Sequence, residues 1–567
     1  MSYTSLIDQL DLRATSEPDA QICADFPIGA SLPQWISAQT FRRDVRSMAH
    51  GLRVAIQEGD RVILMLGSTV DFAVAAFACI EAGVVFVPLP AWGGKKRSRR
   101  FIDVVMDAEA KAIICSESLA SRMSLLDEMP AEFQWFTPER LVLAGREDQD
   151  SSGGFTLHRD VNRLVCLQYT SGSTGKPKGV MLTHKQLILQ ARDHWKYCLE
   201  GSASFCLWLP LYHDFGLNML TTILANQQTQ LTLLDPLEFV RAPVHWLKWM
   251  GQNKIEISFM PNFAAELCVA ALRDDDRTGW DLQHLKRLHS GGEAIIPSSV
   301  KSFEQTFHAM GLKHDVIKPG YGMAEATLVI ASTRPGVPNK VLTLDGQERI
   351  SNGVPYPEIA IKIVDPERCL PLPDGEVGEI WAHSTAGHFA TGYWNKPKET
   401  ERVFGCKLCG ENEGNWLRTG DLGCLVDGEL FITGRLKDLI VINGTNVYPE
   451  DVEASVRGCY AGIQSGGVIA FPVVNGQSKE ELVLAVEMRR DWLRAPRWKE
   501  ASADIRKAVY DAHQLRPGML VYLNPGGIPR TTSGKPRRHE MRIQIEKNEF
   551  NNCRYVERNG SSSEMGA

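Results

Sequence analysis

The chain has 567 residues, too many for one hydrophobic core, so at least two domains are expected. Hydrophobic residues make up 44% and charged residues 23%, a balance typical of a soluble globular protein. The formal net charge of -6 excludes a general attraction to nucleic acid or to an anionic membrane.

The N-terminus and the cysteines indicate where such a chain would work. The first 20 residues are polar and carry four acidic side chains, which excludes an ordinary signal peptide. The most apolar run, residues 72–90, is broken by Glu81 and Gly83, so we interpret it as a buried helix and a core strand rather than a membrane span. Cys406 and Cys409 form a lone pair without a second pair at zinc spacing. Thirteen scattered cysteines suit a reducing, cytoplasmic environment.

Residues 61–115 alternate between short apolar runs and segments with helical periodicity. We expect strands at residues 61–66, 84–88 and 111–115, with helices at 71–82 and 97–110 between them. This alternation predicts right-handed crossovers and a largely parallel sheet, so the expected fold class is α/β.

A stretch rich in glycine and hydroxyl groups follows at residues 169–179, between two short apolar runs expected to be strands. Its three glycines let backbone N–H groups approach phosphate oxygens, four hydroxyls add donors, and Lys176 and Lys178 add charge. It is not a Walker A loop. From composition alone, a phosphate loop and a solvated turn carry about equal weight. Residues 183–186 then have the form of a capping box, which predicts a helix to about Trp195.

Two further strand ends carry candidate substrate-binding groups. His213 follows an apolar run at residues 205–210, a usual position for ligand contacts in α/β sheets, although a lone histidine is more often structural. The run at residues 257–261 ends at Asn262 and Phe263. For each of these, a helix cap or a core position is as good an interpretation as a pocket.

Three turns complete the candidate set. Gly291 and Gly292 let the backbone lie against a flat base, although a simple turn would have the same sequence. Tyr321 stands between glycines and can stack on adenine, and Glu325 offers a hard oxygen ligand suited to Mg²⁺. Asp421 is either an Asx-turn residue or a carboxylate that accepts hydrogen bonds from a diol.

The last third of the chain changes character. Residues 352–381 contain the short β-rich pieces of a small antiparallel unit. A charged turn at 435–438 precedes a compact α+β pattern with helices near residues 501–513, and this pattern ends with a basic loop. The basic loop at 528–538 contains Lys535 and by itself indicates only a solvated surface. Residues 551–567 are polar and rich in serine and glycine, which predicts disorder.

Taken together, these motifs resemble the adenylate-forming superfamily of acyl- and aryl-CoA synthetases, luciferases and adenylation domains. The resemblance covers the chain to about residue 547. Three stretches are similar to the fatty acyl-AMP ligases in particular: Trp208 to Leu217 around His213-Asp214, Ala324 to Leu328, and Asn446 to Asp451. Most of the superfamily has threonine before the glutamate, where this chain has Ala324.

The resemblance implies a layered α/β architecture in two parts. A large N-terminal adenylation domain of α/β sheets plus a small β-rich unit is expected at residues 1–434, and it would bind ATP and the acyl group. A small, mobile α+β domain is expected at 435–548, swinging about a hinge at Lys437. A disordered tail is expected at 549–567.

The resemblance also implies a reaction. A medium- or long-chain fatty acid would be activated by ATP as acyl-AMP, with release of pyrophosphate, and then passed to the phosphopantetheine thiol of an acyl carrier protein. An acyl-CoA synthetase is the alternative, because the inserted segment usual in fatty acyl-AMP ligases looks reduced between residues 327 and 365. A catalytically silent binding module and an unrelated ATPase are further alternatives. Silence is disfavoured because Lys178, Glu325 and Lys535 are all present.

By the same resemblance, individual residues receive roles. Catalysis falls to Lys535, His213 and Glu325, and Glu325 also binds Mg²⁺. The acyl group would contact His213, Asn262, Phe263 and Met323. The residues expected to bind ATP or AMP are Thr170, Ser171, Gly172, Ser173, Thr174, Gly175, Lys178, Gly291, Gly292, Glu293, Tyr321, Gly322, Asp421 and Arg435.

Overall fold

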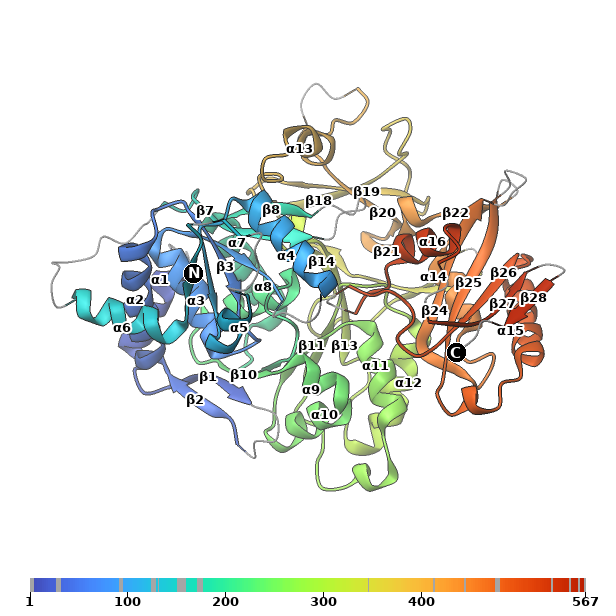
Figure 1. The fold of residues 1–567 in the computed structure, drawn as a ribbon, viewed down its shortest axis with the longest axis horizontal. Helices are drawn as coiled ribbons and strands as arrows, with labels where there is room; N and C mark the ends of the chain where they lie inside the picture. Colours follow the sequence, from blue (N-terminus) through green and yellow to red (C-terminus); the bar gives the residue numbers. More distant parts are fainter. Residues whose placement is uncertain are drawn as a thin grey trace.

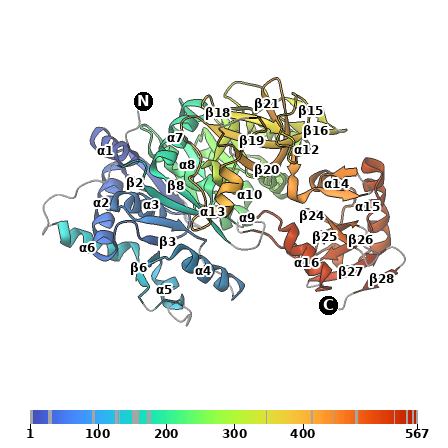
Figure 2. The ribbon, with the colours of Figure 1, turned by 90° about the horizontal axis from the view of Figure 1, so that it is seen from above.

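The computed structural model describes residues 5–26, 32–90, 95–123, 129–130, 132–149, 160–170, 177–344, 346–410, 414–442, 445–474, 480–531, 534–549, 552–558 and 561–564. Two groups of elements are visible in both ribbon views (Figures 1 and 2): a large part coloured blue to yellow, and a smaller part coloured orange to red. The predicted α/β fold class is confirmed. No helix in these ranges is long and apolar enough to cross a membrane.

The first sheet of the large part has six strands. In spatial order they are β6 (Gln134–Phe136), β5 (Ala112–Cys115), β3 (Arg61–Met65), β4 (Val85–Pro88), β7 (Leu164–Thr170) and β8 (Lys178–Thr183). Strands β3, β4 and β5 are parallel, as the alternating pattern predicts. Around this sheet lie α2 (Ala38–Ala55), α3 (Val70–Ala82), α4 (Lys95–Ala108), α5 (Glu117–Met123) and α6 (Pro138–Gln149).

The second sheet has nine strands and a parallel centre. Its order is β17 (Val354–Pro355), β14 (Val329–Ser332), β13 (Ile317–Gly322), β12 (Arg287–Ser290), β11 (Ile257–Met260), β9 (Ser204–Leu207), β10 (Gln230–Leu234), β1 (Gln21–Phe26) and β2 (Gln34–Ser37). Strands β10, β9, β11, β12 and β13 run parallel to one another, so several strand ends meet along one edge.

Helices cover both faces of the nine-stranded sheet. Helix α7 (His184–His194) starts where the capping box predicts it, with the Thr183 N–H donating to Gln186 Oε1 at 2.6 Å. A single π turn, η1 (Trp195–Leu199), extends it. The other helical elements are α1 (Leu6–Ser16), α8 (Asp214–Leu224), α9 (Pro236–Arg241), α10 (Pro243–Gln252), α11 (Asn262–Ala271), η2 (Asp274–Arg277), α12 (Pro297–Phe307), η3 (His308–Met310) and η4 (Ala324–Ala326).

A small antiparallel unit follows, as expected. Its four strands are β18 (Ile359–Val364), β19 (Gly378–Ser384), β20 (Leu417–Val426) and β21 (Glu429–Arg435), with α13 (Pro397–Phe404) beside them. The link between residues 327 and 365, expected to be short, carries a hairpin of β15 (Val341–Leu344) and β16 (Gln347–Ile350). Arg349 of this hairpin forms an ion pair with Asp451 at 2.5 Å, so the link contacts the smaller part of the molecule.

The smaller part has a core of its own. Its elements are η5 (Leu436–Asp438), β22 (Ile440–Ile442), β23 (Thr445–Val447), α14 (Pro449–Val456), β24 (Ile463–Val474), β25 (Glu480–Met488), η6 (Trp492–Arg494), α15 (Trp498–His513), β26 (Met519–Leu523), α16 (Arg538–Glu546), β27 (Cys553–Arg558) and β28 (Ser561–Glu564). Alternate residues of its five-stranded sheet feed two apolar clusters, one on each face. Arg457 also reaches Glu266 of the large part at 3.0 Å.

The expectation of a disordered tail from residue 549 is wrong for the described residues. Strand β27 pairs antiparallel with β26, with Val556 opposite Val521, and β28 continues the sheet. The physical reason is an alternation that average composition conceals: Tyr555 packs against Trp498 at 5.1 Å on one face, and Val556 is buried on the other.

Candidate active site

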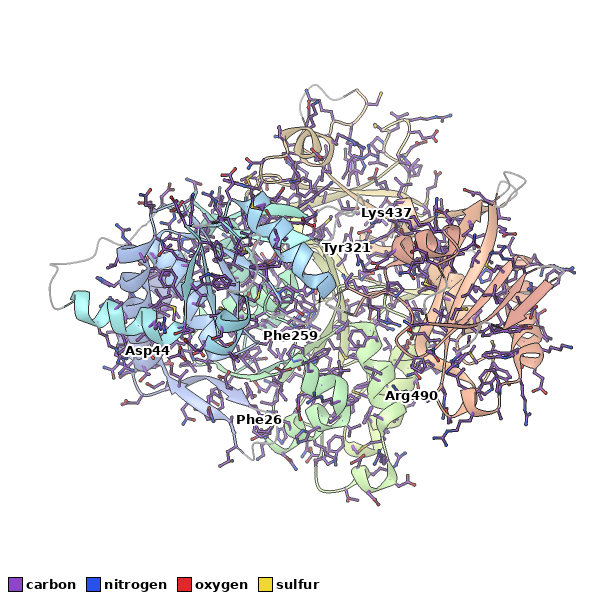
Figure 3. All side chains as sticks on the ribbon, in the orientation of Figure 1. Phe26, Asp44, Phe259, Tyr321, Lys437 and Arg490 are labelled. Atoms are coloured by element: carbon purple, nitrogen blue, oxygen red, sulfur yellow. The ribbon has the colours of Figure 1, made fainter. Side chains whose placement is uncertain are left out.

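Three polar side chains that pair with one another lie where β13 meets the β20–β21 hairpin. The Tyr321 hydroxyl donates to Asp421 Oδ2 at 2.8 Å, and Arg435 Nε lies 3.0 Å from Asp421 Oδ1. Asp421 and Arg435 face each other in the strand register. We call Tyr321, Asp421 and Arg435 the nucleotide cluster. Figure 3 labels Tyr321 and Lys437 near the boundary between the yellow and the orange-red elements.

The electrostatics of this cluster support one another. Burial, followed by the charge of Asp421, raises the pKa of Tyr321 well above its usual value, so its hydroxyl stays a donor. The carboxylate of Asp421 raises the pKa of Arg435. The cluster is therefore a donor, a carboxylate and a cation in fixed positions.

Glu325 sits in the short turn η4 and is held by a residue that sequence reasoning missed. The Tyr393 hydroxyl donates to Glu325 Oε1 at 2.6 Å, and the Ala390 N–H donates to the Glu325 carbonyl at 2.9 Å. Lys178 Nζ lies 5.1 Å from the centre of the Tyr393 ring. Burial raises the pKa of Glu325, and the Tyr393 bond opposes that rise. The sequence signal near Tyr393 is weak, because it consists of an aromatic residue that directly follows Gly392.

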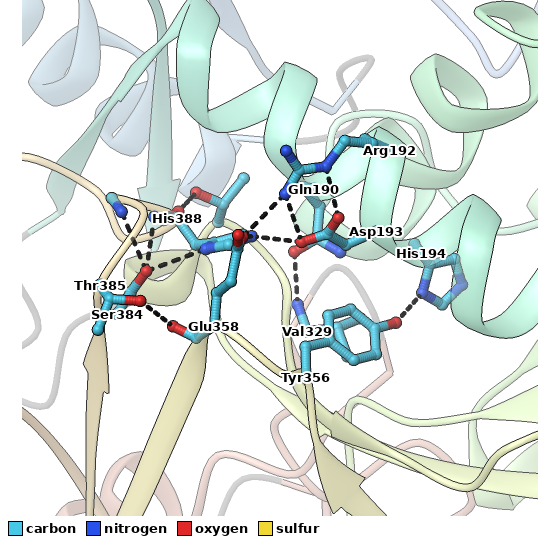
Figure 4. A network of polar contacts seen from close by, with 12 residues as sticks. Gln190, Arg192, Asp193, His194, Val329, Tyr356, Glu358, Ser384, Thr385 and His388 are labelled. Carbon is cyan, nitrogen blue, oxygen red and sulfur yellow. Dashed lines mark hydrogen bonds and ion pairs between the residues drawn. The ribbon is translucent and has the colours of Figure 1, made fainter. Parts of the chain in front are cut away.

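Polar contacts fix the segment that carries Tyr393 (Figure 4). His388 Nε2 lies 2.7 Å from Asp193 Oδ2 on α7, and His388 Nδ1 lies 2.9 Å from Ser384 Oγ. This arrangement resembles a serine–histidine–aspartate triad in outline. However, Ser384 Oγ also accepts from the N–H groups of Gly387 and His388, at 3.1 and 3.0 Å, so it acts as a turn cap rather than a nucleophile.

The turn around Glu325 is closed by backbone contacts that require glycine. A Cβ on Gly322 would lie 1.6 Å from the Leu328 carbonyl oxygen. The Met323 N–H donates to that same carbonyl at 2.8 Å. Thr327 adopts φ of 68°, unusual for a non-glycine residue, and its hydroxyl donates to the His388 carbonyl at 2.6 Å. These contacts fix the position of the Glu325 carboxylate.

Lys535 reaches this region from the smaller part of the molecule. A Cβ on Gly292, which has φ of 84°, would lie 3.9 Å from Lys535 Nζ. Burial lowers the pKa of Lys535, and the charge of Arg435 lowers it further, while Asp214, Glu293 and Asp421 oppose the fall. The ammonium is therefore close to charged groups from several elements of the large part.

The expected acyl-binding residues divide into two kinds. Asn262 Oδ1 accepts from the Ile296 N–H at 3.0 Å, so its side chain closes a turn, which favours the structural interpretation. The Phe263 N–H donates to Glu293 Oε1 at 2.6 Å, while its ring meets Trp208 edge-on at 6.2 Å. Burial raises the pKa of Glu293. The Phe263 ring makes an apolar contact and could also contact an acyl chain, whereas the Asn262 amide oxygen is already hydrogen-bonded to the backbone.

The remaining predicted residues lie around these groups. His213 is the residue before α8, and its N–H donates to the Pro210 carbonyl at 3.1 Å. A Cβ on Gly291 would lie 3.3 Å from the Gly320 carbonyl oxygen, so these two turns touch. Thr170 and Lys178 face each other at the ends of β7 and β8. Ser171, Gly172, Ser173, Thr174 and Gly175 lie outside the described residues.

Comparison with known proteins gives a consistent answer. The family model described as AMP-binding enzyme matches residues 10–394. The chain is 32% identical to 4-hydroxyphenylalkanoate adenylyltransferase of Mycobacterium tuberculosis, over 95% of this chain and 91% of that protein. It is 30% identical to the medium-chain-fatty-acid–[acyl-carrier-protein] ligase JamA of Moorena producens, over 96% and 95%.

The solved structures agree. One from a study of fatty acyl-adenylate ligases of E. coli and L. pneumophila matches with a TM-score of 0.85 and 27% identity, over 97% of this chain and 98% of that one. Adenylate-forming enzymes use ATP, and the family match covers more than half of this chain. The chain belongs to the AMP-binding enzyme family of adenylate-forming ligases, and its resemblance to the fatty acyl-AMP ligases is confirmed.

Proposed function

We propose that this enzyme uses ATP to activate a medium- or long-chain carboxylic acid as acyl-AMP, releases pyrophosphate, and then passes the acyl group to the thiol of an acyl carrier protein. Relatives named as a carrier-protein ligase and as long-chain-fatty-acid–AMP ligases support this reaction. The second candidate is an acyl-CoA synthetase, which would use the same acyl-adenylate and differ only in its acceptor.

The observation that carries the proposal is the convergence of charge at one place. Asp421 and Arg435 come from the antiparallel unit, Glu325 from the nine-stranded sheet, and Lys535 from the smaller part. An unrelated chemistry gives no reason for these groups, from separate elements, to meet. The attack of a carboxylate on the α-phosphorus of ATP explains their convergence, because two anions must approach each other and positive groups offset their repulsion.

Each group then receives one task in the proposed first step. Asp421 accepts hydrogen bonds from the ribose hydroxyls and Tyr321 stacks on adenine beside Gly291 and Gly292. Lys535 offsets the charge that develops on the reacting oxygens, and His213 donates toward the carboxylate of the acid. The acid is already ionised at neutral pH, so no general base is required.

The residues present also suit a magnesium ion. Glu325 presents a carboxylate with one oxygen fixed by Tyr393, and hard carboxylate oxygens are the ligands that Mg²⁺ prefers. When bound, Mg²⁺ would neutralise phosphate charge. Lys178, which lies beside the Tyr393 ring, would contact the same phosphates, and we propose the same role for Thr170 and the residues 171–175.

We further propose that the chain divides into domains at residues 1–434 and 435–548, with Lys437 as the hinge. The separate apolar clusters of the smaller part support this division. Rotation about Lys437 would withdraw Lys535 after adenylation and open a path for the acceptor thiol.

The first test is carboxylate-dependent exchange of labelled pyrophosphate into ATP, using the purified full chain and a series of fatty acids. Exchange that depends on the acid supports adenylate formation. Release of phosphate instead of pyrophosphate would indicate an unrelated ATPase, and the absence of exchange with every acid would indicate a silent module.

The second test separates the acceptors. Coenzyme A and a phosphopantetheinylated carrier protein are supplied in parallel with ATP and the best acid. The carrier-protein thioester is the expected faster product. A faster CoA thioester would replace the first candidate with the second.

A further inference from the structure

A second group of buried polar side chains lies where α7 and η1 meet the β12–β14 edge of the nine-stranded sheet. It consists of the buried residues His194, Arg287, His289 and Thr333 with the half-buried Arg334, and we call it the inner polar cluster. Its buried atoms without a hydrogen-bond partner in the described part of the chain are His194 Nε2, His289 Nε2, Arg287 Nε and Nη1, Thr333 Oγ1 and Arg334 Nη1. So many unpaired polar atoms in one place require an explanation.

Other atoms of the same side chains make hydrogen bonds and ring contacts that fix their positions. His194 Nδ1 lies 2.7 Å from the Tyr356 hydroxyl (Figure 4), and the rings of His194 and His289 are 4.8 Å apart. Arg287 donates to the Thr333 carbonyl. Arg334 donates to the Pro355 carbonyl at 3.0 Å and stacks on the Tyr356 ring at 4.8 Å. The unpaired atoms therefore belong to fixed groups.

The cluster has a surplus of positive charge. Burial, together with the charges of Arg287 and Arg334, lowers the pKa of His194 to about 3. Burial also lowers the pKa of His289 and of Arg287. The groups that act on the charge of Arg287 among the described residues are Cys198, Tyr356 and Arg334, none of which is a carboxylate. A guest must therefore offer oxygen acceptors.

A metal ion would be a poor guest. His194, Cys198 and His289 offer three ligand atoms within 4.8 Å of one another. However, the charge of Arg287 acts on both imidazoles, and the charge of Arg334 acts on His194. A divalent cation would be repelled by both guanidinium groups, so this geometry favours an acceptor over a cation.

Ring contacts connect the inner polar cluster to the proposed reaction site. His289 stands two residues before Gly291 on β12 and stacks on Phe259 at 5.8 Å. Phe259 meets Phe215 edge-on at 6.0 Å, and Phe215 lies in the first turn of α8, directly after His213 and Asp214. Phe259 is labelled in Figure 3 below Tyr321. An acid that extends from His213 along these rings would end at the cluster.

We propose that the inner polar cluster binds the far end of the acid substrate, and that this far end carries an oxygen atom. The inference rests on the proposed function and adds the class of acid. A hydroxyl or a second carboxylate shares the required chemistry. The guanidinium groups donate to the oxygen, and a neutral imidazole can either donate or accept. Loss of the oxygen leaves buried donors unpaired again, which is the basis of selectivity.

The test compares acids of equal length by pyrophosphate exchange. Octanoate, decanoate and dodecanoate are each matched with the ω-hydroxy acid and the dicarboxylic acid. We expect at least one oxygenated acid to exceed its plain partner about tenfold in kcat/KM, since a site built for a polar group rejects the analogue without it. The better oxygenated partner tells whether a neutral or a charged oxygen is bound.

Two variants connect that preference to the cluster. His289→Phe and Thr333→Val should each lower the ratio of oxygenated to plain acid by at least threefold, with KM for ATP unchanged. The matched control is Thr433→Val, because Thr433 Oγ1 is another buried unpaired hydroxyl and both threonines are 4% exposed. Should His289→Phe fail to fold, the two isosteric threonine variants still decide the question.

The outcomes separate two kinds of failure. Exchange with plain acids in preference to every oxygenated partner would overturn this inference while leaving the proposed function intact, and would assign the cluster to buried water only. A preference that survives both variants unchanged would also overturn it. No exchange with any acid would overturn the proposed function itself.

Discussion

The nucleotide cluster and the inner polar cluster both contain buried polar side chains and arginine, yet they differ in one respect. In the nucleotide cluster, Asp421 accepts from Tyr321 and pairs with Arg435, so charge is balanced inside the protein. In the inner polar cluster, Arg287 has no carboxylate partner among the described residues and two of its nitrogens are unpaired. The first cluster is complete without a guest, whereas the second is not.

The difference in hydrogen-bond pairing indicates which cluster can contribute more binding energy to a substrate. A paired carboxylate must exchange partners when a ribose arrives, so its gain is modest and its main benefit is a fixed position. An unpaired buried donor gains a whole hydrogen bond when a guest arrives. The nucleotide cluster should therefore mainly position ATP, and the inner polar cluster should mainly select among acids.

The largest expected effect concerns Lys535, which completes the charged end from the smaller part. Lys535→Ala should lower pyrophosphate exchange about 10³-fold, because a group that offsets developing charge is lost. Thioester formation from supplied acyl-adenylate should change little. Lys499→Ala, an exposed lysine of α15, is the control. Equal loss of both steps would show that the role of Lys535 is misassigned.

The next effect tests whether the nucleotide cluster depends on its charge pairing. Asp421→Asn keeps the size of the side chain but leaves Arg435 unpaired and weakens the Tyr321 bond. We expect KM for ATP to rise about 10²-fold, with the preference among acids unchanged. Asp427→Asn, on the exposed turn of the same hairpin, should have no effect. A changed preference among acids would contradict the separate roles of the nucleotide cluster and the inner polar cluster.

A smaller effect is expected at Tyr393, which donates a hydrogen bond to Glu325 and lies beside Lys178 of β8. Tyr393→Phe removes the hydroxyl bond but keeps the ring beside Lys178. The Mg²⁺ concentration for half-maximal exchange should rise about 3- to 10-fold, the value of one hydrogen bond. Tyr393→Leu should cost more because the ring contact is lost as well. An unchanged magnesium dependence in both variants would remove Tyr393 from the site.

The smallest effect is a shift in pH dependence. Burial lowers the pKa of Lys535, so its charged form is lost at a lower pH than for an ordinary lysine. Because the charged form supports adenylation, exchange should fall as pH rises through that lowered pKa. Lys535→Arg should move this alkaline limb upward, since a guanidinium stays charged. A limb that does not move would assign the titration to another group.

Local sequence patterns predict elements whose signals are local. Periodicity, capping and short apolar runs predict the strands between residues 61 and 115, the capped start of α7, and the strands β7 and β8. The expected roles of Tyr321, Glu325 and Asp421 depend instead on the resemblance of their short motifs to a known family. The structure brings Tyr321 and Asp421 into contact although they are 100 residues apart.

The missed residues depend on contacts between distant elements. Tyr393 donates a hydrogen bond to Glu325, which is 68 residues away in the sequence, and no local pattern around Tyr393 predicts this contact. The inner polar cluster combines α7 with β12 and the residues after β14, so it exists only once helix and sheet are packed. For Asn262 the sequence left a pocket residue and a structural residue as alternatives, and the hydrogen bond that its side-chain oxygen accepts from the Ile296 N–H favours the structural one.

The strand β27 has a practical consequence for anyone who handles this enzyme. A protein truncated at residue 548 would lack β27, so β26 would become an edge strand. Its backbone N–H and C=O groups that now pair with β27 would be exposed. Such a fragment should aggregate during expression, and Trp498 would lose its stacking partner Tyr555. Purification handles are therefore safer at the opposite end of the polypeptide.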